Sequence, residues 1–187
     1  MMKTSILLAL LTFSLFFQAC SNEDKSNNHK ANNMLATNEY VLSDLNNTQL
    51  IAQKKNAGFS LDNAEGKVII FDIFATWCPP CRAAASHLSS LQEKYKDNLV
   101  IIGITIENDI ANEKLLEFRK MYNANYTLVN SKENRRLVND IAKSLEVGER
   151  FPIPLMAMYL DGKLINHYVG AIEEEFIESD IKRALGI

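Results

Sequence analysis

Residues 68–81 read VIIFDIFATWCPPC, and this segment indicates the architecture of the whole chain. Its first half, residues 68–74, is a run of β-branched and aromatic side chains interrupted only by Asp72. A short run of this kind is typical of a strand that is buried on both faces. Because Cys78 and Cys81 follow the run and precede a helical pattern, the segment predicts a reactive dithiol at a strand-to-helix turn.

The residues after the first cysteine predict a helix over residues 79–95. Its buried face would consist of apolar residues at spacings of four, three and four: Ala84, Leu88, Leu91 and Tyr95. Pro79 and Pro80 fit only the start of such a helix, where a missing N–H costs nothing and the fixed φ is already helical. Cys78 would then lie at the helix N-terminus, where unsatisfied N–H groups and the helix dipole favour a thiolate. We therefore expect an ionised Cys78 sulfur that is exposed to partner molecules.

Other roles for the cysteine pair fit the sequence less well. A zinc site needs about four ligands, but the third cysteine, Cys20, lies far upstream. Covalent haem attachment requires His directly after the second cysteine, where this chain has Arg82. A Cys–His hydrolase gains nothing from a second nearby cysteine, and a structural disulfide closing so short a loop stabilises little. Copper binding would need a well-placed histidine. We expect no metal, and no cofactor beyond a Cys78–Cys81 disulfide.

The N-terminus has the pattern of an export signal. Lys3 precedes an uncharged apolar run at residues 5–17, which suits a signal peptide and is too short to span a bilayer comfortably. The run ends in FQAC at residues 17–20. This ending resembles a bacterial lipoprotein box, in which the cysteine, here Cys20, is acylated and becomes the new N-terminus. The alternative is a soluble secreted protein that keeps Cys20 as a free thiol.

Three regions follow from these patterns. We expect residues 1–19 to be a signal peptide, residues 20–38 to be an Asn- and Ser-rich flexible tether with the lipid on Cys20, and residues 39–187 to be one folded domain. The chain of 187 residues has a net charge of −3 and no Lys/Arg run, which argues against a nucleic-acid partner. The expected location is the bacterial cell envelope, on the extracytoplasmic side of a membrane.

Within the domain, strand and helix patterns alternate after short extended pieces at residues 40–61. Strands are predicted at residues 68–74, 99–106, 126–129, 155–160 and 163–169, and helices at residues 79–95, 111–123 and 133–145. Residues 111–123 take their apolar positions from Leu115, Leu116, Phe118 and Tyr122. A last helix is predicted to direct four side chains inward: Phe176, Ile177, Ile181 and Leu185. Such alternation implies a parallel or mixed sheet covered on both faces, with the site at the carboxyl ends of its strands.

The order of the short motifs resembles that of a thioredoxin fold over about residues 66–185. The motifs are Asp72, Trp77 to Cys81, Ile153-Pro154, Asp161-Gly162 and Val169-Gly170-Ala171. An extra segment at about residues 108–147, together with the N-terminal extension and the lipoprotein-type signal, resembles the membrane-anchored TlpA-like or ResA-like thiol-disulfide oxidoreductases. The fold class implied is α/β and thioredoxin-like. It has a central mixed sheet with helices on both faces, an N-terminal extension and an inserted helix–strand segment.

The resemblance implies a role for each motif residue. Cys78 would be the attacking nucleophile and Cys81 the resolving thiol, with Asp72 as a buried carboxylate that exchanges protons with Cys81. The alternative is that Asp72 has no catalytic role and is a buried polar group whose hydrogen bonds are satisfied. Pro154 would follow a cis peptide bond. A shallow substrate groove would be formed by Trp77, Pro79, Pro80, Ile153, Pro154, Gly170 and Ala171.

Three positions depart from the thioredoxin pattern. The strand beside the aspartate has Gly103 where thioredoxins carry a lysine, so proton handling is expected to differ. Ser86 replaces a proline that often kinks the active-site helix, and Leu155 replaces the threonine that commonly follows the cis-proline.

The function implied by the resemblance is that of an extracytoplasmic reductant of protein disulfides in the TlpA-like manner, in cytochrome c maturation. Its partners would be protein thiols and disulfides, a membrane electron donor, and the membrane itself through lipidated Cys20. The chain is expected to be a monomer. The alternatives are a disulfide oxidase or isomerase, and a non-enzymatic copper-binding or adaptor lipoprotein of the same fold.

Overall fold

The computed structural model describes residues 38–187. The predicted signal peptide (1–19), the predicted lipidation site Cys20 and the predicted tether, apart from its last residue, lie outside the described residues. Along the described part, no helix is both long and apolar enough to cross a membrane.

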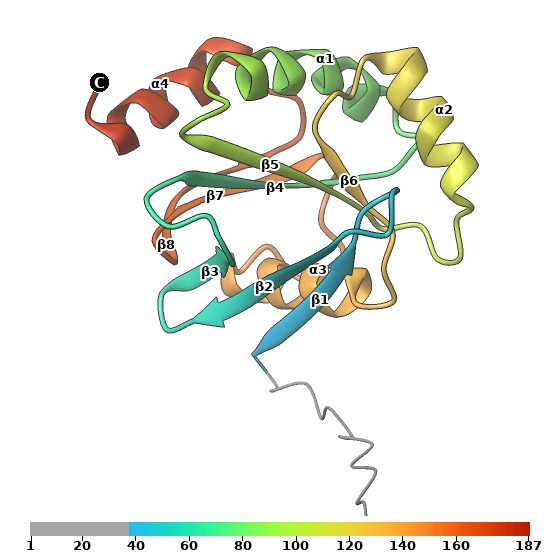
Figure 1. The fold of residues 1–187 in the computed structure, drawn as a ribbon, viewed down its shortest axis with the longest axis horizontal. Helices are drawn as coiled ribbons and strands as arrows, with labels where there is room; N and C mark the ends of the chain where they lie inside the picture. Colours follow the sequence, from blue (N-terminus) through green and yellow to red (C-terminus); the bar gives the residue numbers. More distant parts are fainter. Residues whose placement is uncertain (1–37) are drawn as a thin grey trace, which may run out of the picture. The chain divides into compact units, whose positions relative to one another are not determined.

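A five-stranded mixed sheet forms the centre of the domain (Figure 1). Its strands, in spatial order, are β6 (Thr127–Val129), β5 (Leu99–Thr105), β4 (Val68–Phe74), β7 (Leu155–Leu160) and β8 (Lys163–Val169). β4, β5 and β6 run parallel to one another, whereas β7 is antiparallel to both β4 and β8. All seven residues of the central strand β4 are buried, as its apolar composition predicted. The mixed sheet expected from the sequence is therefore confirmed.

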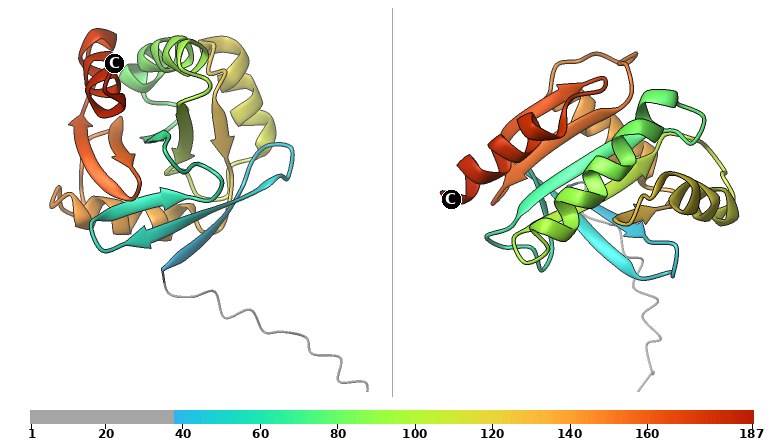
Figure 2. Two further views of the ribbon diagram at one scale, coloured as in Figure 1. Left: turned by 60° about the vertical axis from the view of Figure 1, so that its left-hand side comes forward. Right: turned by 90° about the horizontal axis from the view of Figure 1, so that it is seen from above.

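Two layers cover the sheet, one on each face (Figures 1 and 2). The first consists of the helices α1 (Pro79–Lys94), α2 (Asn112–Tyr122) and α4 (Glu174–Leu185). The second consists of α3 (Asn134–Ser144) and an antiparallel sheet of β1 (Glu39–Ser43), β2 (Gln49–Lys55) and β3 (Gly58–Leu61). Successive side chains of a strand point to opposite faces, so Ile70 and Phe74 pack under α1 whereas Ile69 and Phe71 pack toward α3. The N-terminal extension is thus part of the domain and closes one of its two cores.

The predicted inward direction of Phe176 is wrong, because this side chain is 61% exposed. Leu116, one of the apolar positions of the predicted helix over residues 111–123, is 46% exposed. In α4 the buried stripe is formed by Ile177 and Ile181, four residues apart, and Phe176 is one residue away, about 100° around the helix axis. In α2 the same argument applies to Leu116, because the adjacent Leu115 is buried. The predicted element boundaries differ from the observed ones by one residue at several ends.

Candidate active site

The disulfide Cys78–Cys81 lies at the N-terminus of α1. Cys78 is the N-cap residue, and its Sγ accepts a hydrogen bond from the Cys81 backbone N–H at 3.3 Å. Pro79 and Pro80 occupy the first two helical positions. A backbone N–H at these positions would have no acceptor within the helix, so proline costs no hydrogen bond there. The placement of the dithiol at a strand-to-helix turn is as the sequence predicted. A helix N-terminus stabilises negative charge, so this position favours a thiolate once the disulfide is reduced.

The cis-proline loop contacts the disulfide, and the end of β8 contacts the cis-proline loop. The Ile153–Pro154 peptide bond is cis, and the Ile153 carbonyl oxygen lies 3.7 Å from the Cys78 Sγ. The Gly170 N–H donates a hydrogen bond to the Pro154 carbonyl at 2.8 Å, which joins the end of β8 to the same loop. The structure therefore brings together loops that are about 75 and 90 residues from the dithiol in the sequence.

The predicted groove residues differ in exposure. Trp77, which precedes the dithiol, is 60% exposed, and Pro79, Pro80 and Ala171 are exposed as well. Ile153 and Gly170 are half-buried, and Pro154 is buried. An apolar surface with a large exposed indole at its edge is a feature of sites that bind other proteins.

The expectation of an exposed Cys78 sulfur is wrong for this disulfide state, because Cys78 and Cys81 are each only 3% exposed. The Cys78 sulfur is turned back over the first turn of α1 and lies beneath the Ile153 carbonyl. A partner molecule therefore has little direct access to this sulfur while the disulfide is closed. Reaction of the reduced protein with iodoacetamide measures that accessibility directly.

Asp72 lies in the middle of β4 and is buried. By strand alternation its side chain points to the same face as Ile70 and Phe74, the face covered by α1, whose first turn contains Cys81. Its Oδ2 accepts a hydrogen bond from the Tyr126 hydroxyl at 2.9 Å. Burial raises the pKa of Asp72 to about 7, although the Tyr126 hydrogen bond lowers it. The predicted upward shift is confirmed, and it gives Asp72 a pKa suited to proton exchange at neutral pH.

Glu107, which follows β5, is a site residue that sequence reasoning missed. Its carboxylate accepts hydrogen bonds from the Thr76 backbone N–H at 2.6 Å and from the Thr76 hydroxyl at 3.0 Å. On the other side of the loop, the Arg82 Nε donates to the Thr76 carbonyl at 2.8 Å. Thr76 is two residues before Cys78, so these bonds hold the loop that positions the dithiol.

We expect Glu107→Ala to lower the free energy of unfolding by about 1–3 kcal/mol, because it leaves the half-buried Thr76 N–H without its acceptor. Urea denaturation of the oxidised protein measures this. Glu107→Gln keeps an acceptor oxygen and should lose less. Glu65→Ala, at an exposed position between β3 and β4, is the control and should change the value by less than about 0.5 kcal/mol. Equal values for Glu107→Ala and Glu65→Ala would show that Glu107 does not anchor the loop.

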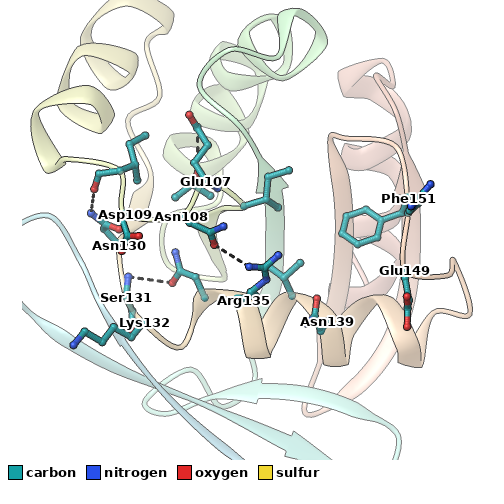
Figure 3. A pocket seen from close by; sticks show the side chains of 16 residues that line it. Glu107, Asn108, Asp109, Asn130, Ser131, Lys132, Arg135, Asn139, Glu149 and Phe151 are labelled. Carbon is teal, nitrogen blue, oxygen red and sulfur yellow. Dashed lines mark hydrogen bonds between the residues drawn. The ribbon is translucent and has the colours of Figure 1, made fainter.

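A cleft of about 990 Å³ adjoins the loops that position the dithiol. It is bounded by the loops after β5 and β6, by α3 and by the segment before β7 (Figure 3). Glu107 lies on one side of it, Arg135 on α3 contacts Asn108 across it, and Phe151 lies on the other side (Figure 3). Glu107 binds the loop before Cys78, and Phe151 is two residues before Ile153, so the cleft adjoins the active-site loops at two points.

No group of three or more His, Cys, Asp and Glu side chains in residues 38–187 is arranged to hold a metal ion.

The position that thioredoxins fill with lysine is Gly103, which pairs with Asp72 in the β4–β5 register as the sequence indicated. The group that contacts Asp72 is instead Tyr126, which sequence reasoning placed in a strand without assigning it a role. A glycine inside a strand can mark the close approach of another group. Gly103 is therefore the feature of the sequence that could have indicated a side chain packed against Asp72.

A mixed sheet with a Cys-Pro-Pro-Cys disulfide at a helix N-terminus, facing a cis-proline, defines a protein of the thioredoxin-like fold class. The sequence model of the Redoxin family matches residues 29–185, and the chain belongs to this family.

Individual relatives show the same relationship. The chain is 28% identical over 126 residues to the thiol-disulfide oxidoreductase ResA of Bacillus thuringiensis, a match that covers 66% of each chain. It is 29% identical over 75 residues to the thioredoxin-like protein YneN of Bacillus subtilis, covering 40% of this chain and 44% of YneN. The structure superposes on that of a thiol:disulfide interchange protein from Chlorobium tepidum with a TM-score of 0.63 and 18% identity, covering 80% of this chain and 94% of the other. The aligned region spans less than half of YneN and just under two thirds of ResA.

Proposed function

We propose that the protein is a thiol-disulfide oxidoreductase that reduces disulfides in other proteins through the Cys78–Cys81 dithiol. The observation that carries this proposal is the position of the Cys78 Sγ, at the N-cap of α1 and 3.7 Å from the carbonyl oxygen that precedes cis-Pro154. The helix N-terminus favours the thiolate needed for attack, and the backbone next to it at Ile153 can pair with an extended substrate segment. The similarity to the thiol-disulfide oxidoreductase ResA and to the thiol:disulfide interchange protein from Chlorobium tepidum supports the same reaction class.

The reaction proceeds in two exchanges. The Cys78 thiolate attacks one sulfur of the substrate disulfide, forming a mixed disulfide and releasing the other substrate sulfur as a thiolate that takes a proton from water. Asp72 then accepts the proton of the Cys81 thiol, and the Cys81 thiolate attacks the Cys78 sulfur. The second substrate sulfur leaves and is protonated. The substrate gains two electrons and two protons, and the protein is left with the Cys78–Cys81 disulfide seen in the structure.

The substrate is a polypeptide in extended conformation. Backbone groups of Ile153 beside the dithiol can pair with such a segment as an added strand, and the exposed indole of Trp77 offers it an apolar surface. The cleft between Glu107 and Phe151 gives the chain that flanks the substrate disulfide a polar surface on which to lie. Leu155, after the cis-proline, makes the groove more apolar than a threonine would.

The proposed setting is the extracytoplasmic side of a bacterial membrane, with the domain held by a lipid on Cys20 and re-reduced by a membrane electron donor. This part rests on the lipoprotein-type pattern of residues 5–20 and on the resemblance of the sequence to the TlpA-like or ResA-like class of membrane-anchored oxidoreductases. Cytochrome c maturation is the pathway proposed for it. The mass of the mature N-terminus tests the anchor, and an unmodified Cys20 would contradict it.

The equilibrium of the dithiol with glutathione tests the direction of electron flow. A potential near about −270 mV, as in thioredoxin, supports a reductant, whereas a value near about −120 mV would make the protein an oxidase instead. Insulin reduction in the presence of dithiothreitol tests the activity itself. Absence of turnover by the wild-type protein under these conditions would refute the proposed function.

A further inference from the structure

Tyr126 reaches Asp72 through space that Gly103 leaves open. A Cβ atom on Gly103 would lie 2.6 Å from the Leu128 Cδ2 and 2.9 Å from the Tyr126 Cε2, closer than side chains tolerate. Tyr126 immediately precedes β6 and belongs to the same buried cluster as Cys78 and Cys81. The glycine on β5 therefore makes room for an aromatic ring whose hydroxyl ends at the Asp72 carboxyl.

The two oxygens of Asp72 are in different situations. Oδ2 accepts the Tyr126 hydroxyl, whereas Oδ1 is buried and has no hydrogen-bond partner among residues 38–187. A buried carboxylate oxygen without a hydrogen-bond partner is unfavourable, so its presence in a native fold needs an explanation. Reversible protonation of Oδ1 provides one.

Few other groups influence this carboxyl. Its register neighbours are Gly103 on β5 and Met156 on β7, neither of which titrates. Next to β6, the titratable group that faces Asp72 is Tyr126. On the helical layer above Asp72, α1 carries the dithiol. The influences on the Asp72 pKa are burial and the Tyr126 hydrogen bond, with no contribution from a charged side chain.

We propose that Tyr126 is a positioning residue that holds Oδ2 of Asp72 and so leaves Oδ1 as the oxygen that exchanges a proton with Cys81. This inference rests on the proposed function. In the resolving step the Cys81 S–H bond breaks, the proton moves to Oδ1, and the sulfur keeps the electron pair with which it attacks Cys78. Tyr126 is neither oxidised nor reduced, and its hydroxyl proton stays in place. Burial and the adjacent carboxylate raise the pKa of Tyr126 well above its ordinary value, so it donates throughout the working pH range.

The test is Tyr126→Phe, which keeps the ring and removes the hydroxyl. Loss of a hydrogen bond that lowers the Asp72 pKa should move the ionisation of Asp72 upward by roughly one pH unit. NMR titration of carboxyl-labelled aspartate measures this without any assay of activity. In insulin reduction the acid limb of the pH–rate profile should shift by the same amount. The rate should therefore fall several-fold near pH 6 and return to the wild-type value near pH 9.

Tyr168→Phe is the matched control. Tyr168 is a buried tyrosine of the same cluster, and its hydroxyl also donates to a buried carboxylate, that of Asp180. Both variants should have a lower free energy of unfolding, but only Tyr126→Phe should shift the acid limb of the pH–rate profile of insulin reduction. In an Asp72→Asn background the Tyr126→Phe change should have no further effect on the profile. Should Tyr126→Phe fail to fold, Gly103→Ala, which displaces the ring, should give a shift of the same sign.

The outcomes separate the two proposals. An unchanged Asp72 titration in Tyr126→Phe, or an equal shift in Tyr168→Phe, would overturn the positioning role even if the wild-type protein reduces insulin. An inactive wild-type protein would overturn the proposed function, while the titration of Asp72 would still report whether Tyr126 controls its ionisation.

Discussion

Cys78→Ser is expected to abolish insulin reduction, lowering the rate by roughly 10³-fold or more. A serine hydroxyl is not ionised at neutral pH even at a helix N-terminus, so the first attack on the substrate disulfide is lost. Cys81→Ser should behave differently, because Cys78 can still attack but nothing resolves the mixed disulfide. Non-reducing electrophoresis and mass spectrometry should detect a covalent complex with substrate for Cys81→Ser and none for Cys78→Ser.

Ser86→Ala is the control for these variants, since Ser86 is an exposed residue on the same helix and should keep wild-type turnover. Turnover by Cys78→Ser comparable to that of the wild type would end the enzymatic interpretation and favour an adaptor role. A covalent complex with Cys78→Ser, but not with Cys81→Ser, would instead show that the roles of the two sulfurs are exchanged.

The sequence predicted those features that depend on local patterns. The seven residues of β4 are apolar enough to identify a central strand, and Pro79 and Pro80 locate the start of α1 because proline tolerates few other helical positions. The direction of the Asp72 side chain also follows from strand alternation, and its raised pKa follows from burial. The cis bond before Pro154 was predicted through the family resemblance, since no local pattern distinguishes it from a trans bond.

Features that depend on contacts between distant segments were not predicted. Tyr126 meets Asp72 across 54 residues of sequence, and Glu107 meets Thr76 across 31. Neither pair has a spacing that a single sequence reveals. The exposure of Phe176 was misjudged because helical periodicity allowed both it and Ile177 to face inward, and packing against the sheet selected Ile177. The burial of Cys78 depends on the loop around Ile153, which is 75 residues away.

Asp72→Asn is expected to stabilise the protein above neutral pH. The pKa of Asp72 is about 7 in the folded state, against an ordinary value of 3.8. Between these values the folded state binds more protons than the unfolded state, so the free energy of unfolding falls as pH rises from about 4 to about 7. The loss amounts to roughly 4 kcal/mol at pH 8. Asparagine cannot ionise, and its carbonyl oxygen can still accept a hydrogen bond from the Tyr126 hydroxyl. The variant therefore does not lose this stability as the pH rises.

Urea denaturation of the oxidised protein at pH 5 and pH 8 tests the prediction. The gain from Asp72→Asn should be largest at pH 8 and less than half as large at pH 5, where only part of the loss has accrued, while insulin reduction slows because the proton acceptor for Cys81 is gone. Asp180→Asn is the matched control of opposite sign. Burial raises the pKa of Asp180, but hydrogen bonds from Asn166 and Tyr168 and the charge of Arg183 outweigh it and lower the pKa overall. The folded state therefore favours ionised Asp180, and its replacement should cost stability at pH 8. A gain from Asp72→Asn that is the same at both pH values would show that ionisation of Asp72 is not what destabilises the fold.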